Sequence, residues 1–290
     1  MSQRMPTAEL LVKLGVPKDF IDPGLPRGTM SHSQYNSYLI CGQAYYYKYV
    51  EGRTTPGYAA TSRGSAVHSG IEFALIAKMN KQKIPSLAEA MAIVSDSFDN
   101  EAKSVLSWGE ESEGSIKDNA LGLYKLFHEK NLPNLNPIAV EKGFAAKIGD
   151  VPVVGYIDLL DDVSAVSLAG LPAEVAAIAP RKIVVVDSKT SSKKWSESQV
   201  RSNGQLTLYA GVENTPFVRI DQLVQPASGK VSLNVVPSER TQQDIALLAE
   251  HYNEVAGFIK KGVFPKAPLD SWACSESHCS FWKDCRGKQR

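Results

Sequence analysis

The sequence predicts an α/β fold in which a mixed β-sheet is flanked by helices. Two patterns support this. Apolar residues at helical spacing dominate the first half of the chain, and β-rich runs begin at Pro137 and alternate with helical segments from there on. With 43% hydrophobic and 22% charged residues, the composition is that of a globular protein, and it argues against a disordered chain, a collagen or a coiled coil.

The first half of the chain is expected to be helical. Residues 1–30 are rich in Pro and Gly, so a short helix followed by an irregular arm is expected there. Ser31 and Ser33 offer N-cap side chains to a helix that carries Cys41. The expected helices are residues 34–50, 63–80, 86–108 and 115–131.

The second half is expected to hold the sheet. Gly149-Asp150 is a turn signal, so the first two strands should form a hairpin. The alanine-rich residues 165–180 receive no assignment. The expected strands are residues 138–148, 151–160, 181–187, 217–225 and 230–237, with helices over residues 199–212 and 239–262. We predict one domain over residues 1–290, divided into an arm (1–30), a helical region (31–135), a β-core (136–238) and a C-terminal helix with a cysteine tail (239–290).

Charge restricts the partners that the chain can bind. Lys and Arg total 32 and Asp and Glu total 31, so nucleic acid must bind through a local patch. Residues 181–201 hold six basic and two acidic side chains. A basic loop with an aromatic residue suits single-stranded DNA, although a solvated loop with a capping Trp is the alternative. The expected DNA contacts are Lys193, Lys194, Trp195 and Arg201.

No membrane association is expected. The longest uncharged run, residues 28–47, is crowded with Ser, Gln and Asn, which a membrane-spanning helix would not tolerate. The N-terminal residues contain Glu9 and no sustained apolar stretch, so a secretory signal is not expected either. We therefore expect a cytoplasmic protein.

An acid and a lysine lie side by side at one strand end. Asp187 ends the apolar run Ile183 to Val186, and Lys189 follows two residues later, so both side chains point to the same side of the strand. A carboxylate that holds a divalent cation and an ammonium that stabilises developing negative charge suit phosphodiester cleavage. A surface salt bridge is the alternative, because Glu101 and Lys103 have the same spacing on a polar helix.

Other polar residues give this pair a context. Asp158 ends the preceding strand, and two acids at neighbouring strand ends repel each other unless a cation lies between them. His68 follows Gly64, Ser65 and Ala66, small residues that would let its helix approach the sheet closely. Gln205 and Tyr209 share a helix face. Taken singly, each has an ordinary structural explanation: a turn acid, a packed histidine, the polar edge of a helix.

Together these residues form an ordered set of motifs: Gly64/His68, Gly155/Asp158, Asp187/Lys189/Thr190 and Gln205/Tyr209. The set resembles the PD-(D/E)XK nuclease superfamily, and within it the RecB-like branch, which includes the nuclease domains of RecB and AddB and the CRISPR-associated and phage-encoded RecB-like exonucleases. The resemblance covers residues 31–285. It implies a restriction-endonuclease-like core with a helical N-terminal region.

The resemblance also implies roles for these residues. His68, Asp158, Asp187 and the backbone carbonyl of Ser188 would bind Mg²⁺ or Mn²⁺, and Lys189 would be the catalytic lysine. Gln205 and Tyr209 would contact DNA or orient the site. Glu141 is an accessory-acid candidate, with a surface strand acid as the default reading. The implied activity is that of a metal-dependent DNA exonuclease acting in recombination, repair or end processing.

The four cysteines suggest a second site. Cys274, Cys279 and Cys285 lie among Ser, Glu, His and Asp rather than in an apolar segment, which favours thiolate ligation, and Cys41 lies far upstream. Four thiolates suit either Zn²⁺ or an iron–sulfur cluster, and His278 could replace a thiolate in a zinc site. A pair of disulfides is a further alternative.

The resemblance favours a 4Fe-4S cluster, because RecB-like nucleases of the AddB and CRISPR-associated type place one cysteine before the histidine motif and three at the C-terminus. Two features depart from that pattern. The close pair is C-x4-C instead of C-x2-C, and Gly42 follows the first cysteine where proline is usual. The cluster would have a structural role.

Two rival functions stay open at this stage. The chain could be a nuclease-like module that grips DNA ends or a recombination partner without cutting, or a zinc-stapled α/β protein of unrelated function. No G-x-x-x-x-G-K-[ST] phosphate loop is present, so strand separation would need a partner helicase, and a recombinase or single-strand-binding protein could also take part.

Overall fold

The computed structural model describes residues 5, 7–55, 57–105, 108, 111–164 and 182–286. They divide into two compact units. The first comprises Gly57–Lys142 and Tyr156–Thr241, and the second comprises Met5–Pro56, Gly143–Gly155 and Gln242–Arg290. The single nuclease domain therefore stays a prediction. Among these residues no helix has the length and apolarity needed to span a bilayer. The alanine-rich residues 165–180 lie outside the described part.

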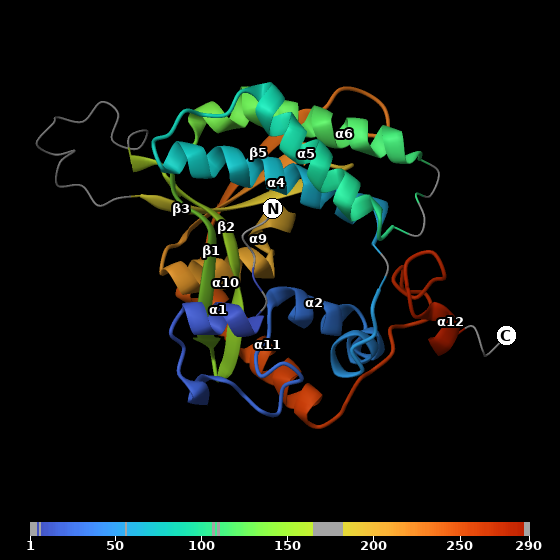
Figure 1. Ribbon diagram of the computed structural model, residues 1–290. Coiled ribbons are helices and arrows are strands. Elements are labelled where there is room, and N and C mark those ends of the chain that lie inside the picture. The colour runs from blue at the N-terminus through green and yellow to red at the C-terminus, as the bar shows by residue number, and fades with distance from the viewer. Residues whose placement is uncertain are drawn as a thin grey trace, which may run out of the picture. The chain divides into compact units, whose positions relative to one another are not determined.

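Five strands of the described residues form one mixed sheet, in the order β1-β2-β3-β4-β5 (Figure 1). β2 and β3 are antiparallel, β3 and β4 are parallel, and β4 and β5 are antiparallel. The strands are β1 (Pro137–Ile148), β2 (Val151–Asp162), β3 (Ile183–Ser191), β4 (Phe217–Val224) and β5 (Ser232–Glu239). The predicted α/β class with a mixed sheet and flanking helices is confirmed.

The predicted turn between the first two strands is confirmed. Gly149 and Asp150 join β1 to β2, and Gly149 has a φ of +58°, a value that glycine adopts without strain. The Asp150 N–H donates to the Asn253 side chain at 3.0 Å. A turn of two residues therefore sets the pairing of these two long strands.

Three helices cover one face of the sheet: α4 (Ala59–Met79), α5 (Leu87–Ala102) and α6 (Glu113–Leu126), the last continuing as a π-helical turn, η3 (Phe127–Asn131). A short 3₁₀ turn, η4 (Leu132–Asn134), leads from there to β1. The buried side chains of these helices share a core with Leu159, Val184 and Val186 of the sheet. Because strand side chains alternate between faces, the side chains of Asp187 and Lys189 point to the opposite face.

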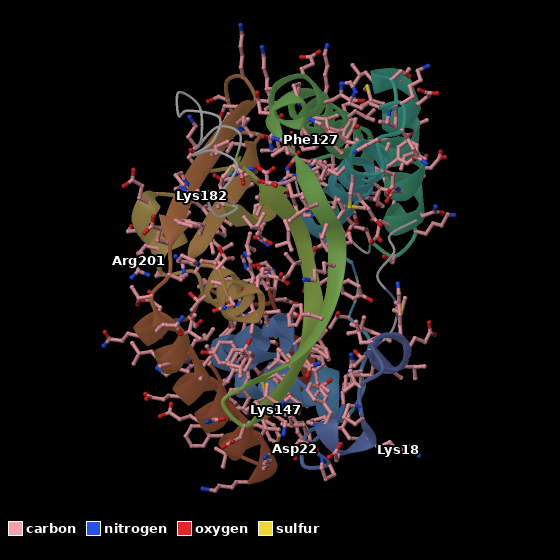
Figure 2. The ribbon with its side chains drawn as sticks, turned by 90° about the vertical axis from the view of Figure 1, so that its left-hand side faces the viewer. Lys18, Asp22, Phe127, Lys147, Lys182 and Arg201 are labelled. Atoms are coloured by element: carbon pink, nitrogen blue, oxygen red, sulfur yellow. The ribbon has the colours of Figure 1, made fainter. Side chains whose placement is uncertain are left out.

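The crossover between β3 and β4 is broken into two helices, α9 (Glu197–Arg201) and α10 (Gly204–Glu213). The single helix predicted over residues 199–212 is wrong at this point. The Asn203 side chain accepts a hydrogen bond from the Leu206 N–H and so begins a new helix. The buried Arg240 guanidinium donates to the Val200 carbonyl, which satisfies the end of the first one. Figure 2 shows Arg201 at the end of α9.

The second unit is mainly helical. The continuous helix predicted through Cys41 is wrong, because Cys41 is extended, with φ −164° and ψ 108°. A Cβ on Gly42 would lie 2.7 Å from Pro265, so this close approach requires glycine. The helices are α1 (Thr7–Lys13), η1 (Lys18–Phe20), α2 (His32–Ile40), α3 (Gly42–Tyr45), η2 (Tyr46–Val50), α11 (Gln242–Lys260) and α12 (Trp282–Cys285).

The crossing of α4 with its neighbours gives a stability test at Gly70. An added Cβ would lie 2.5 Å from Val94 and 2.8 Å from Tyr124. We predict that Gly70→Ala destabilises the fold by about 1–3 kcal/mol through overpacking, more than the ~1 kcal/mol that alanine contributes to helix propensity. Gly122 of α6 has open space around it, so Gly122→Ala should be neutral or stabilising by roughly 1 kcal/mol. Thermal unfolding of both variants provides the measurement, and equal effects would contradict the packing argument.

Candidate active site

The middle segments of β2 and β3 bring two acids together. The prediction that each acid ends its strand is wrong, because β2 continues to Asp162 and β3 continues to Ser191. Leu159 pairs with Val186, so the register, continued by one residue, places Asp158 opposite Asp187. Asp187 is completely buried, with 0% of its surface exposed, and Asp158 is also buried. Asp187 is therefore not a member of an ordinary surface salt bridge, which was the alternative reading of its pairing with Lys189.

The burial and the pairing alter the acidity of Asp187. Burial disfavours the carboxylate and raises the pKa of Asp187 above its ordinary value. The charge of Lys189 opposes this rise in pKa, whereas the nearby Asp158 adds to it. A cation placed between the two acids would favour both carboxylates, so the pair is suited to metal binding.

Lys189 connects this acid pair to α10. Its Nζ lies 2.8 Å from Asp187 Oδ2 and donates to Gln205 Oε1 at 3.1 Å. Gln205 in turn donates through Nε2 to the Tyr209 hydroxyl at 2.7 Å. Tyr209 is buried, with 5% exposed, which favours the orienting alternative over a direct contact with DNA. The four residues form one chain of polar contacts.

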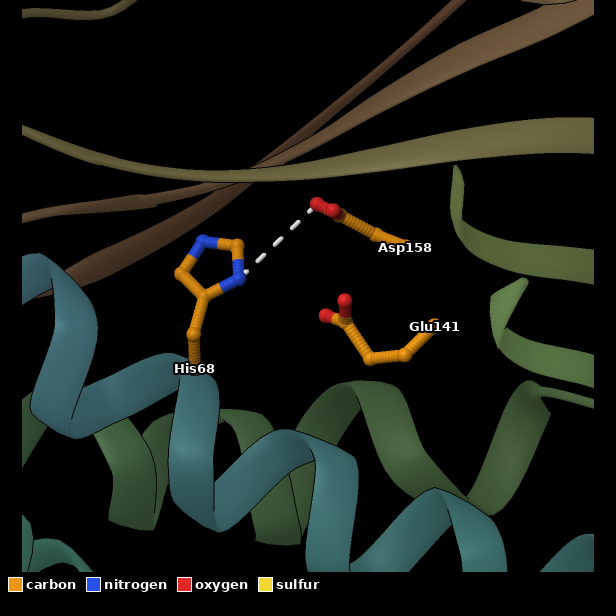
Figure 3. Close-up of side chains that lie close together, drawn as sticks. All are labelled: His68, Glu141 and Asp158. Atoms are coloured by element: carbon orange, nitrogen blue, oxygen red, sulfur yellow. Dashed lines mark ion pairs between the residues drawn. The ribbon is translucent and has the colours of Figure 1, made fainter. Parts of the chain in front are cut away.

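A second set of ligand atoms converges beside Asp158. His68, Glu141 and Asp158 each offer an atom that lies within 4.8 Å of those of the other two (Figure 3). His68 Nδ1 is 3.8 Å from Asp158 Oδ2, and the same oxygen accepts the Ser188 N–H at 3.1 Å. In the part of the chain that the structure describes, this is the one group of three or more such residues. Asp187 is not a member of this group, but it interacts with Asp158, which is.

Glu141 has an unusual backbone for a strand residue. It lies within β1 with φ +47°, in the left-handed region that residues with a Cβ rarely adopt. Its side chain is buried, with 9% exposed. Strained residues of this kind cluster at functional sites. The sequence offered Glu141 as an accessory acid, and nothing in the sequence indicates this conformation.

The approach of α4 to the sheet follows the prediction. A Cβ on Gly64 would lie 3.3 Å from Thr190 Oγ1, tighter than most packing contacts. Glycine therefore allows α4 to come close to the end of β3. His68 follows one turn later on the same face of the helix, which sets its imidazole beside Asp158.

The expected DNA-binding residues follow β3. Lys193 and Lys194 are exposed and Trp195 is half-buried. Arg201 is exposed at the end of α9 (Figure 2). Arg181 of the basic segment lies outside the described residues, as do Lys288 and Arg290 of the C-terminus.

The four cysteines belong to the second unit, and all four are free thiols. Cys41, Cys274, Cys279 and Cys285 line one pocket that is partly open to solvent. The Ala267 N–H donates to Cys41 Sγ at 3.4 Å. Burial raises the pKa of the Cys279 thiol, and the other three cysteines add to the rise. The thiols are thus neighbours, although they are not drawn together as closely as His68, Glu141 and Asp158.

A family model for the PD-(D/E)XK nuclease superfamily matches residues 29–286. The chain belongs to the PD-(D/E)XK nuclease superfamily. Nucleases of this superfamily use divalent metal ions, and His68, Glu141 and Asp158 form an acidic site of the kind that such ions occupy. The superfamily membership thus agrees with the coarse chemistry of the site.

One solved structure shares this fold. A candidate exonuclease from Eubacterium rectale is 10% identical, with a TM-score of 0.51 over 96% of this chain and 93% of that protein. The protein SSO0001 is 12% identical over 89% of this chain and 96% of its own, with a TM-score of 0.35. No curated protein sequence matches this PD-(D/E)XK chain.

The converging ligands predict a measurable metal site. We expect His68→Ala, Glu141→Gln and Asp158→Asn each to weaken Mn²⁺ binding by tenfold or more, because each removes a ligand of a small site. Isothermal titration of Mn²⁺ into the purified chain measures this. Asp99→Asn is the control, since Asp99 is exposed and pairs with Lys117 away from the site. Unchanged affinity in all three variants would contradict the assignment.

Proposed function

We propose that this PD-(D/E)XK protein is a metal-dependent DNA exonuclease. One observation carries the proposal: His68 and Glu141 converge on Asp158 of β2, and Asp158 neighbours Asp187 of β3, which pairs with Lys189. A site with three acids, an imidazole and a lysine matches the needs of phosphodiester hydrolysis better than those of a core. The E. rectale structure, described as a candidate exonuclease, supports the same reading.

The donor atoms suit Mg²⁺ or Mn²⁺. Carboxylate oxygens are the preferred ligands of these hard cations, and a single imidazole is compatible with Mn²⁺. His68, Asp158 and Asp187 are the proposed ligands, with the Ser188 carbonyl, and Glu141 joins them because its side chain already lies with His68 and Asp158. When bound, the metal would supply an activated water and neutralise charge on the phosphate.

The protein's own residues would do the remaining work. Lys189 Nζ lies 2.8 Å from Asp187 Oδ2, which fixes its position. The Lys189 side chain is 30% exposed, so its ammonium group is accessible to a phosphate oxygen. Gln205, held by Tyr209, keeps that ammonium in place. Lys193, Lys194, Trp195 and Arg201 are proposed to bind the DNA strand.

The catalytic assignment has a matched control within the chain. We predict that Asp187→Ala and Lys189→Ala each lower cleavage of end-labelled DNA with Mn²⁺ by at least 10³-fold, because preorganised charge stabilisation commonly contributes that much. Lys103→Ala should leave cleavage unchanged, since Lys103 is the lysine of the second acid-x-Lys pair and bonds only Asn100 among the described contacts. Near-parental turnover of the Lys189 variant would contradict the assignment. Binding of DNA by the wild type without cleavage would favour the non-cleaving module.

We further propose that the chain belongs to the RecB-like branch and carries a 4Fe-4S cluster on Cys41, Cys274, Cys279 and Cys285. Four free thiols lining one pocket are a suitable donor set. Lys266 and Arg286 line the same pocket and would offset the negative charge of four thiolates. Such a cluster would close a loop of more than 230 residues and so restrict the unfolded state.

The cluster proposal predicts a visible signature. Anaerobically purified protein should be brown, with broad visible absorbance and about four iron atoms per chain. Cys279→Ser should lose both, whereas His278→Ala should keep both, because His278 contacts Ser275 and Ser277 and is not a proposed ligand. Zinc in place of iron, or loss of metal in the His278 variant, would support the zinc alternative.

A role in DNA recombination, repair or end processing is proposed with this activity. The chain lacks a phosphate loop of its own, so strand separation, where a substrate needs it, would come from a helicase or a recombination protein as partner. A phage-encoded or CRISPR-associated setting is consistent with the resemblance. Digestion of single-stranded and blunt duplex DNA, labelled at either end, would determine strand preference and polarity.

A further inference from the structure

A fully buried glutamine lies next to the lysine of the site. Gln222 of β4 is directly opposite Lys189 in the parallel pair of β3 and β4, and 0% of its surface is exposed. Opposite residues of paired strands share a face, so Gln222 points to the same side of the sheet as Lys189 and Asp187. No role described above uses it.

The Gln222 amide is saturated by the loop that follows β3. Its Oε1 accepts the Trp195 N–H at 2.9 Å, and its Nε2 donates to Ser191 Oγ at 2.7 Å and to the Lys193 carbonyl at 3.0 Å. A fourth bond, from Asn234 of β5 to Oε1 at 3.0 Å, completes the capacity of the amide. Three of its four partners thus belong to residues 191–195.

Asn234 reinforces the same contact. It pairs with Gln222 across β4 and β5, and its Nδ2 also donates to the Trp195 carbonyl at 3.2 Å. Trp195 is therefore fixed at both its N–H and its carbonyl. The Lys193 carbonyl accepts from Ser191 as well as from Gln222. The backbone of the loop is held while the side chains of Lys193 and Lys194 stay exposed.

We propose that Gln222, with Asn234, is a positioning residue for the nucleic-acid strand. It holds residues 191–195 against β4 and β5, which fixes the backbone that carries Lys193, Lys194 and Trp195 as a preformed binding edge after Lys189. Two lysines on a free loop would lose conformational entropy on meeting phosphates, whereas a preordered loop avoids most of that loss. This inference rests on the proposed nuclease function and names the part of the site that receives the substrate.

An ordinary structural role makes a different prediction. If Gln222 only satisfied buried polar groups, its loss would lower the melting temperature and leave strand binding by the folded protein unchanged. If it positions the lysines, its loss should reproduce the loss of the lysines themselves. The two roles are separated by the salt dependence of binding, because each lysine–phosphate contact contributes roughly 0.7 to the slope of log Kd against log salt for single strands.

The experiment compares Gln222→Met, Asn234→Ala, Lys193→Ala/Lys194→Ala and Gln222→Met combined with both lysine changes. Single-stranded oligonucleotide binding is measured in EDTA across a salt series, and KM and kcat are measured with Mn²⁺. Gln34→Met is the control, because Gln34 is a buried glutamine of the second unit. Asn234→Ala removes fewer contacts, so it serves if the Gln222 variant does not fold.

We expect Gln222→Met to raise KM five- to twentyfold with kcat within about threefold of the wild type, and to flatten the salt slope as far as the lysine pair does. The Kd of the combined variant should lie within about twofold of the Kd of the lysine variant, since both changes remove the same contacts. An unchanged KM and an unchanged salt slope in folded Gln222→Met would overturn the inference, and so would full additivity of the Gln222 and lysine changes. In either case cleavage by the wild type would still support the proposed function. Wild-type protein that neither cuts nor binds DNA would remove the proposed function, and this inference with it.

Discussion

Two carboxylates buried within adjacent strands are the constraint around which the first unit is built. The register of β2 and β3, continued by one residue, places Asp158 opposite Asp187, and both side chains are buried. Burial and mutual repulsion raise the pKa of Asp187, and Lys189 compensates only in part. Two buried carboxylates repel each other when no cation is present, and a cation between them removes that repulsion. The geometry therefore favours the binding of a metal ion.

The surrounding elements serve that pair from three sides. Gly64 lets α4 approach the sheet and places His68, β1 turns Glu141 inward through a strained backbone, and α10 holds Lys189 through Gln205. Each contributor sits on a helix or strand, which keeps its position more fixed than a loop would. The exception is the loop after β3, whose backbone is hydrogen-bonded to the side chains of Gln222 and Asn234.

The sequence was sufficient to predict the parts of this arrangement that depend on local patterns. The β-rich and apolar runs predicted the mixed sheet, and the small residues before His68 predicted the close approach of its helix. The breaks at Cys41 and Asn203 were not predicted, and the contacts found beside them come partly from Pro265 and Arg240, which are distant in the chain. The left-handed Glu141 and the amide of Gln222 have no local signature either, since one strand acid or one strand glutamine resembles any other.

The most direct test of the metal centre is a crystal structure of the chain soaked with Mn²⁺, with anomalous scattering recorded to locate the ion. The account predicts one anomalous peak between β2, β3 and α4, with oxygens of Asp158 and Asp187 and a nitrogen of His68 at roughly 2 Å from it. A map with full Mn²⁺ occupancy elsewhere and none between these three side chains would contradict it.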